Sequence, residues 1–140
     1  MTNQERLFVA LVEVVALAGI GAGCAHRENM QAASGVPAAQ GTVTATKDSD
    51  GNTDLVVDVK HLARPDMVTA GATVYLVWID PAGGKMESVG ILNLGSNLEG
   101  ILKTKTPQRK FALAITPEAN AQVERPAHAP VFTANVDRGD

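Results

Sequence analysis

The sequence contains a single cysteine, Cys24, and few of the patterns on which catalytic sites are built. One cysteine cannot form an internal disulfide, so the fold must depend on packing alone. The formal net charge is −3, whereas a nucleic-acid-binding domain carries a clear positive excess. Serines are scarce, and there is no nucleophile elbow, phosphate-binding glycine loop or metal-ligand spacing. These absences predict a non-enzymatic protein with no cofactor and no metal, and they argue against nucleic acid as a partner.

The longest apolar run, residues 7–23, opens the chain and ends at Cys24. Its apolar side chains would cover most of a helical circumference, which is not the pattern of an amphipathic core helix. A permanent transmembrane helix needs about 20 apolar residues, and Glu13 near the centre would cost about 3 kcal/mol. An export signal needs a charged start, an apolar stretch and small residues before the cut. Arg6 supplies the charged start, and residues 21–23 are the small residues before the cut. We therefore interpret residues 1–23 as a signal peptide, with an uncleaved anchor as the alternative.

Residues 21–24, Gly-Ala-Gly-Cys, resemble the lipobox of bacterial lipoproteins. In that family the sulfur of the cysteine receives a diacylglycerol, and the chain is cut before that cysteine. The resemblance implies lipidation at Cys24 and a membrane held through that anchor, because two or three acyl chains bind firmly where one binds only marginally. It also implies the periplasmic or extracytoplasmic face of the cell envelope. Ala25 stands where an aspartate would retain an enteric-type lipoprotein at the inner membrane, which favours the outer membrane.

Residues 24–40 differ in composition from the rest of the chain that follows. From Ala25 to Gln40 they are rich in alanine and polar residues, they have no periodicity, and they include Gly35 and Pro37. Such a composition predicts a disordered tether between the lipid and a folded domain. The alternative is a short helix around residues 30–33.

From residue 41 to residue 137, short apolar runs alternate with clusters of Gly, Pro, Asn and Asp. Alternation with period two is clearest at residues 54–60, and residues 73–79 are apolar on both faces, as in a central strand. We therefore expect strands near residues 42–47, 54–62, 73–80, 87–94, 98–105, 110–116 and 130–137. About seven strands in about 100 residues predict an all-β, immunoglobulin-like β-sandwich. We expect Val57, Trp78, Phe111 and Leu113 in its core, with Trp78 where such sandwiches commonly bury a tryptophan.

Residues 73–94 and 111–132 look like the extracytoplasmic C-terminal domain of anti-sigma-K factors. The positions that match the family pattern are Tyr75, Trp78, Gly90, Phe111, Thr116 and Glu118. Residues 59–78 also resemble a group of uncharacterised bacterial exported proteins with one such domain. The resemblance covers roughly residues 54–136 and implies the fold. The sigma-binding segment of those factors has no counterpart here, and a fold by itself does not carry an activity.

Two polar groups have the residue types of a metal site. Asp48, Asp50, Asn52 and Asp54 alternate as in a calcium loop, but the sixth and twelfth places lack the glycine and glutamate that an EF-hand needs. This pattern therefore favours a hairpin turn with an acidic edge. His61 and His128 have no third ligand nearby in the sequence, so we expect ordinary histidines there.

Two further segments are candidates for recognition. Lys103, Lys105, Arg109 and Lys110 cluster around one predicted turn, where they could contact anionic headgroups or an acidic polymer. The interpretation we favour is a solvated edge that discourages sheet-to-sheet association. The other candidate is the long loop of residues 117–130, because a long loop at the end of a sandwich commonly carries recognition.

These observations together predict a lipid-anchored, non-enzymatic binding or structural module of the bacterial cell envelope. Its partner would be an envelope protein or polymer, in addition to the membrane. An alternative is an accessory envelope-stress sensor that works with a membrane regulator of the anti-sigma type. A hydrolase whose site has no recognisable motif is a third hypothesis, which an activity screen with substitutions of Glu118 and Glu124 would test.

Overall fold

The computed structural model describes residues 24–139, so the predicted signal peptide lies outside the described residues. The described chain consists of strands and one short helix: β1 (His26–Asn29), β2 (Gln31–Ala32), β3 (Gln40–Lys47), β4 (Thr53–Lys60), α1 (Pro65–Val68), β5 (Val74–Asp80), β6 (Glu87–Leu92), β7 (Gly100–Thr106), β8 (Lys110–Glu118) and β9 (Phe132–Asp137). Within residues 24–139, no helix is long and apolar enough to cross a membrane.

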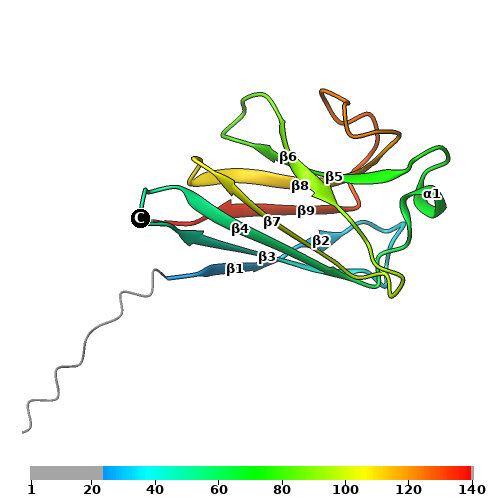
Figure 1. The fold of residues 1–140 in the computed structure, drawn as a ribbon, viewed down its shortest axis with the longest axis horizontal. Helices are drawn as coiled ribbons and strands as arrows, with labels where there is room; N and C mark the ends of the chain where they lie inside the picture. Colours follow the sequence, from blue (N-terminus) through cyan, green and yellow to red (C-terminus); the bar gives the residue numbers. More distant parts are fainter. Residues whose placement is uncertain (1–23, 140) are drawn as a thin grey trace, which may run out of the picture.

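The strands form two antiparallel sheets that pack face to face (Figure 1). One sheet has four strands in the order β1-β3-β4-β7, and the other has five in the order β2-β9-β8-β5-β6. The connections from β4 to β5, from β6 to β7 and from β7 to β8 each pass from one sheet to the other, as in immunoglobulin-like sandwiches. The predicted all-β sandwich is confirmed. All seven expected strands are present as β3 to β9, and the total in the described chain is nine rather than seven.

The two additional strands correct the prediction of a disordered tether over residues 24–40. Strand β1 pairs with β3 at the edge of the four-stranded sheet, and β2 pairs with β9 at the edge of the five-stranded sheet. Between them the chain passes from one sheet to the other at Met30, whose backbone N–H donates to the Gly41 carbonyl at 2.8 Å. Met30, Val36 and Ala39 are buried, with exposed fractions of 7%, 5% and 6%. The folded domain therefore begins directly after Cys24.

The physical reason for this error is that the segment is held by isolated contacts and not by a periodic face. Strand β1 reads His-Arg-Glu-Asn, which has no apolar residue, and β2 has only two residues. The burial of residues 24–40 comes instead from single apolar side chains, those of Met30, Val36 and Ala39, which close the open edge between the two sheets. Gly41 makes room for one of them, because a Cβ atom there would overlap the Met30 Cε atom and lie 3.2 Å from the Phe132 ring.

The space between the sheets is filled by alternate residues of each strand. Val57 from β4 packs there with Phe111 and Leu113 from β8, and all three are at most 3% exposed. Strand β5 contributes Tyr75, Val77 and Ile79 to the same cluster. Because side chains alternate along a strand, Leu76 and Trp78 must then point to the opposite face of the sheet.

Trp78 is buried, with 1% of its surface exposed, but it does not belong to the cluster between the sheets. It lies on the outer face of the five-stranded sheet, where its indole Nε1 donates to the Thr116 hydroxyl at 2.8 Å. This corrects the expectation that Trp78 would occupy the inter-sheet position of immunoglobulin-like domains. The chain after β8 returns over this outer face, and strand β5 is consequently buried on both sides.

Candidate functional site

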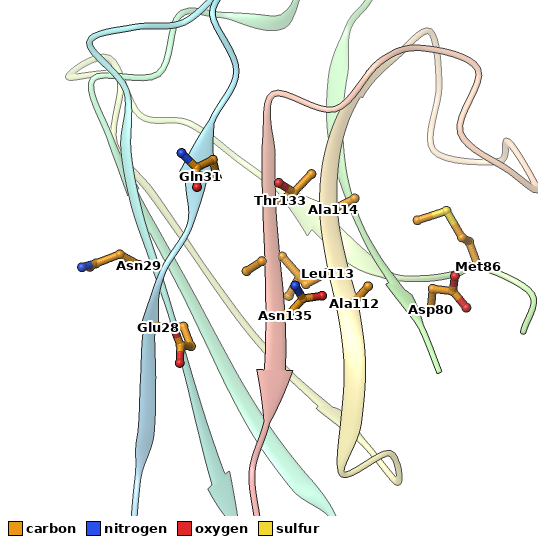
Figure 2. A pocket seen from close by; sticks show the side chains of 11 residues that line it. Glu28, Asn29, Gln31, Asp80, Met86, Ala112, Leu113, Ala114, Thr133 and Asn135 are labelled. Carbon is orange, nitrogen blue, oxygen red and sulfur yellow. The ribbon is translucent and has the colours of Figure 1, made fainter. Parts of the chain in front are cut away.

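A hollow of about 590 Å³ lies on the outer face of the five-stranded sheet (Figure 2). We call it the outer groove. Its floor is formed by β8 and β9, one rim by β1 and β2, and the other rim by the end of β5 and the turn that follows it.

The floor is shallow because small residues occupy the outward positions of β8. Phe111, Leu113 and Ile115 point into the core, so the intervening Ala112 and Ala114 face outward. Strand β9 places Thr133 and Asn135 beside them (Figure 2). Backbone therefore lies close to the surface over two neighbouring strands, and an elongated ligand could approach it closely.

The rims carry polar side chains, and their charge is of one sign. Glu28, Asn29 and Gln31 line one side, while Asp80 and Met86 line the other (Figure 2). Two of the 11 lining residues are acids, and none is a lysine, arginine or histidine. The Asp80 Oδ1 atom is shielded from solvent and has no hydrogen-bond partner. The groove thus presents negative potential and one acceptor atom that lacks a donor.

The groove continues into two neighbouring hollows. One of about 400 Å³ shares Glu28, Asp80 and Asn135 with it and is extended by Lys110 and Asp137. The other, of about 470 Å³, shares Met86 and extends to Glu124 and its neighbours in the loop after β8. The concave surface therefore runs from the start of β1, past the turn after β5, to the predicted recognition loop.

A buried chain of hydrogen bonds fixes the beginning of that loop. The Trp78 indole donates to the Thr116 hydroxyl, and this hydroxyl donates to Glu118 Oε2 at 2.7 Å. The Ala127 backbone N–H donates to the same carboxylate, at 3.2 Å to Oε1 and 3.3 Å to Oε2. Glu118 has no exposed surface. The last residue of β8 thereby ties down the middle of the loop, through donors that satisfy a buried charge.

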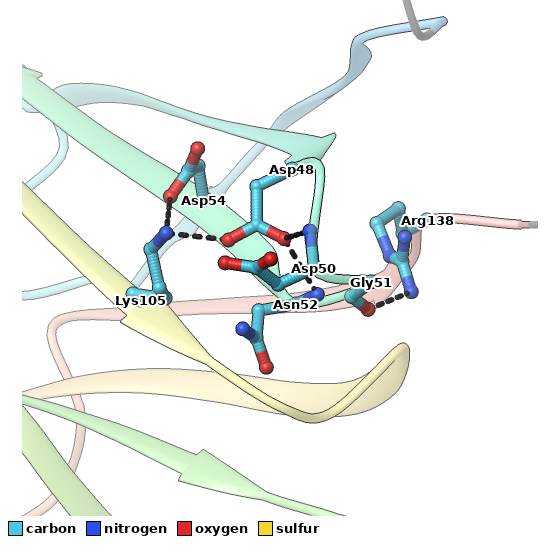
Figure 3. A network of polar contacts seen from close by, with 7 residues as sticks. All are labelled: Asp48, Asp50, Gly51, Asn52, Asp54, Lys105 and Arg138. Atoms are coloured by element: carbon cyan, nitrogen blue, oxygen red, sulfur yellow. Dashed lines mark hydrogen bonds and ion pairs between the residues drawn. The ribbon is translucent and has the colours of Figure 1, made fainter.

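The acidic turn of residues 48–54 is a hydrogen-bonded hairpin turn, in the form that the sequence favoured (Figure 3). Asp48 Oδ1 accepts the backbone N–H groups of Asp50 and Asn52, at 2.9 and 2.8 Å. Its other oxygen contacts the Lys105 ammonium, which also lies 3.3 Å from Asp54 Oδ1. The hydrogen bond from Lys105 and those from the turn backbone lower the pKa of Asp48 to about 2. The pKa of Lys105 is raised, chiefly by Asp48 and then by Asp54.

Two cations of the basic cluster at residues 103–110, Lys105 and Lys110, lie beside acids of the same molecule. Lys105 is held between Asp48 and Asp54, and the Lys110 ammonium lies 4.0 Å from Asp137. These pairings reduce the positive potential of this edge. They agree with the interpretation of a solvated strand edge more than with that of an anion-binding patch.

The remaining predicted residues are spread over the surface. Cys24 is exposed at the start of the described chain. His61 and His128 are exposed on separate loops, and among residues 24–139 no group of three or more His, Cys, Asp or Glu side chains could hold a metal ion. Glu124 is exposed and lines one of the hollows, whereas Glu118 is buried and braces the loop.

Sequence reasoning did not find the groove itself. Its residues come from five strands and a turn, and Glu28 and Gln31 lie in the segment that was predicted to be disordered. The one available signal was the small size of Ala112 and Ala114 between large core residues, since such positions permit close approach to the backbone. Comparison of the chain with protein-family models, with curated proteins and with solved structures finds no match.

Proposed function

We propose that this protein is a lipid-anchored, non-enzymatic binding module of the bacterial cell envelope, with the outer groove as its binding surface. The observation that carries the proposal is the groove: a concave surface of about 590 Å³ beside a loop that a buried hydrogen-bond chain holds in place. A buried polar network that is fully satisfied rigidifies its surroundings. A rigid concave surface loses little conformational entropy when a ligand binds, which favours a binding role.

The arrangement of polar groups in the groove supports binding more than catalysis. Its one hydroxyl belongs to Thr133, and no described hydrogen bond joins that hydroxyl to Glu28 or Asp80. A nucleophile needs a base within hydrogen-bond reach. The amides of Asn29, Gln31 and Asn135 supply donors and acceptors for recognition instead.

The lipid anchor is supported by the lipobox-like residues 21–24 and by the exposure of Cys24. Strand β1 begins at His26, so only Ala25 separates the cysteine from the sandwich. Two residues of extended chain reach about 7 Å. An acylated Cys24 would therefore hold the sandwich directly against the membrane surface, with the turn of residues 48–52 at the same end of the molecule (Figure 1).

Metabolic labelling of the full chain with radioactive palmitate tests the anchor. We expect label on the wild-type protein and none on Cys24→Ala, and we expect intact mass spectrometry to show a chain that begins at Cys24 with added lipid. An unmodified thiol on a chain that still begins at Met1 would refute the anchor.

Photo-crosslinking in intact cells tests the binding surface separately. A photoreactive amino acid at position 133, on the groove floor, should capture a partner. The matched control position is 56. It lies on the outer face of the four-stranded sheet, because its neighbours Leu55 and Val57 both point into the core. Equal capture at both positions would mean that the groove is not the binding surface.

A further inference from the structure

We propose that the outer groove binds an extended peptide segment of a partner protein, one that carries two cationic side chains about four residues apart. This inference rests on the proposed binding role of the groove and is independent of the lipid anchor. Its basis is the charge of the two rims, the spacing between them and the unpartnered polar groups on the floor.

The charge of the groove calls for a cationic ligand. The two acids stand on opposite rims, Glu28 on β1 and Asp80 at the end of β5, and the lining includes no basic side chain (Figure 2). The imidazole Nε2 of His26, just outside the lining, lies 2.8 Å from Glu28 Oε1, so a ligand would meet Glu28 at its other carboxylate oxygen, Oε2. Asp80 Oδ1 is shielded from solvent without a donor, although a buried acceptor is normally paired. Because Oδ1 is shielded, an ammonium or guanidinium group from a ligand would meet the other carboxylate oxygen of Asp80, Oδ2, where it would form a charge-assisted hydrogen bond and offset the charge.

The spacing of the rims fits an extended chain. Asp80 pairs with Ala112 and Ala112 pairs with Asn135, so these residues form one row across three neighbouring strands. Two strand spacings cover about 10 Å, and Glu28 lies beyond β9. An extended peptide rises about 3.4 Å per residue, so basic residues at positions i and i+4 are about 14 Å apart. That distance matches a ligand that reaches from Asp80 across the floor to Glu28.

The floor offers hydrogen bonds that suit a peptide backbone. Asn135 is exposed at the centre of the row, and its carboxamide presents a donor and an acceptor that no described hydrogen bond uses. A peptide group has a C=O acceptor and an N–H donor that complement the donor and the acceptor of this carboxamide. The four aromatic rings in residues 24–139, those of Tyr75, Trp78, Phe111 and Phe132, are at most 3% exposed, so a sugar finds no ring to stack on in the groove.

The test is a fluorescence anisotropy titration of the full-length protein with a labelled heptapeptide, Ser-Lys-Thr-Ser-Thr-Lys-Ser. The matched control peptide has glutamate in place of both lysines. We expect saturable binding of the lysine peptide alone. Asp80→Asn should raise its Kd about tenfold, the usual effect of one charge-assisted hydrogen bond, and Asn135→Ala should also raise it.

The protein control is Asp58→Asn, which removes the same charge from the outer face of the four-stranded sheet and should leave the Kd within twofold. Far-UV circular dichroism verifies that each variant is folded. Cys24→Ala should bind the peptide as wild type does, so a failed anchor and a failed groove give different results. The proposal is overturned by the absence of saturable binding, by equal binding of the glutamate peptide, by an equal effect of Asp58→Asn, or by spermine or a neutral chito-oligosaccharide binding in the groove where the peptide does not.

Discussion

The hydrogen-bond chain behind the groove offers the sharpest test of the structure, through the substitution Thr116→Val. Valine has almost the shape of threonine but lacks the hydroxyl, so packing is retained while two buried hydrogen bonds are lost. The Trp78 indole loses its acceptor at 2.8 Å, and the Glu118 carboxylate loses a donor at 2.7 Å. All three side chains are at most 1% exposed, so water cannot replace the hydroxyl without rearrangement.

The expected loss of stability follows from these two bonds. A buried neutral donor without a partner costs about 1–3 kcal/mol, and a hydrogen bond to a charged group contributes about 1.5–3 kcal/mol. Thr116→Val should therefore lower the free energy of unfolding by about 3–5 kcal/mol. That is a large part of the 5–15 kcal/mol typical of a domain. With a urea m-value of about 1–3 kcal/mol/M, the midpoint should fall by roughly 2 M.

Urea unfolding followed by tryptophan fluorescence is the appropriate assay, because Trp78 is the chain's one tryptophan and belongs to the hydrogen-bond chain. Thr116→Ser is the control: it keeps the hydroxyl and loses one methyl group, which costs about 1 kcal/mol. If Thr116→Val unfolds at the same urea concentration as Thr116→Ser, with the same native emission, the hydrogen-bond chain contributes no stability and the reasoning is refuted.

Three further predictions concern packing and ionisation. Gly41→Ala should destabilise the fold by about 1–3 kcal/mol, because the new Cβ atom overlaps the Met30 side chain. Calorimetry should show a smaller loss when Gly41→Ala is made in the Met30→Ala variant. If the two losses simply add, Met30 does not contact position 41. Burial raises the pKa of Tyr75, the chain's one tyrosine, to about 12, so absorbance should show no phenolate near pH 10 in the folded protein, and stability should fall as the pH rises from 10 to 12. The pKa of Asp48 is lowered to about 2, so its contribution to stability should be present above pH 4 and lost between pH 4 and pH 2, and Asp48→Asn should remove that part of the acid dependence.

Seven of the nine described strands could be predicted from the sequence because their information is local. In β4 the apolar residues recur with period two, and the turn of residues 48–52 has the acidic and glycine residues that such turns require. Strand β5 is apolar on both faces, which correctly indicated that both would be covered. Each of these signals lies within about ten residues, so no knowledge of the remaining chain was needed.

The candidate site could not be predicted in the same way, because its residues meet only through long-range pairing. Glu28 and Asp80 are on strands of different sheets. Asn135 is placed relative to Asp80 by the pairing of β9 with β8 and of β8 with β5. Glu118 was interpreted as a residue of a recognition loop, yet it is the buried end of β8. Nothing in the residues near it indicates that a donor nine positions later, at Ala127, satisfies its charge.

The amino-acid pattern alone was enough for the all-β class, for seven strands and for the turn chemistry, since alternation and turn propensity act between neighbours in the chain. Whether residues 26–40 are ordered, and which face buries Trp78, depended on the assembled sandwich. An edge strand without apolar residues is stable only because β3 supplies its hydrogen-bond partners. The Trp78 indole is buried on an outer face, where the Thr116 hydroxyl of the neighbouring strand β8 accepts its hydrogen bond. Such contacts exist only after the two sheets have packed together.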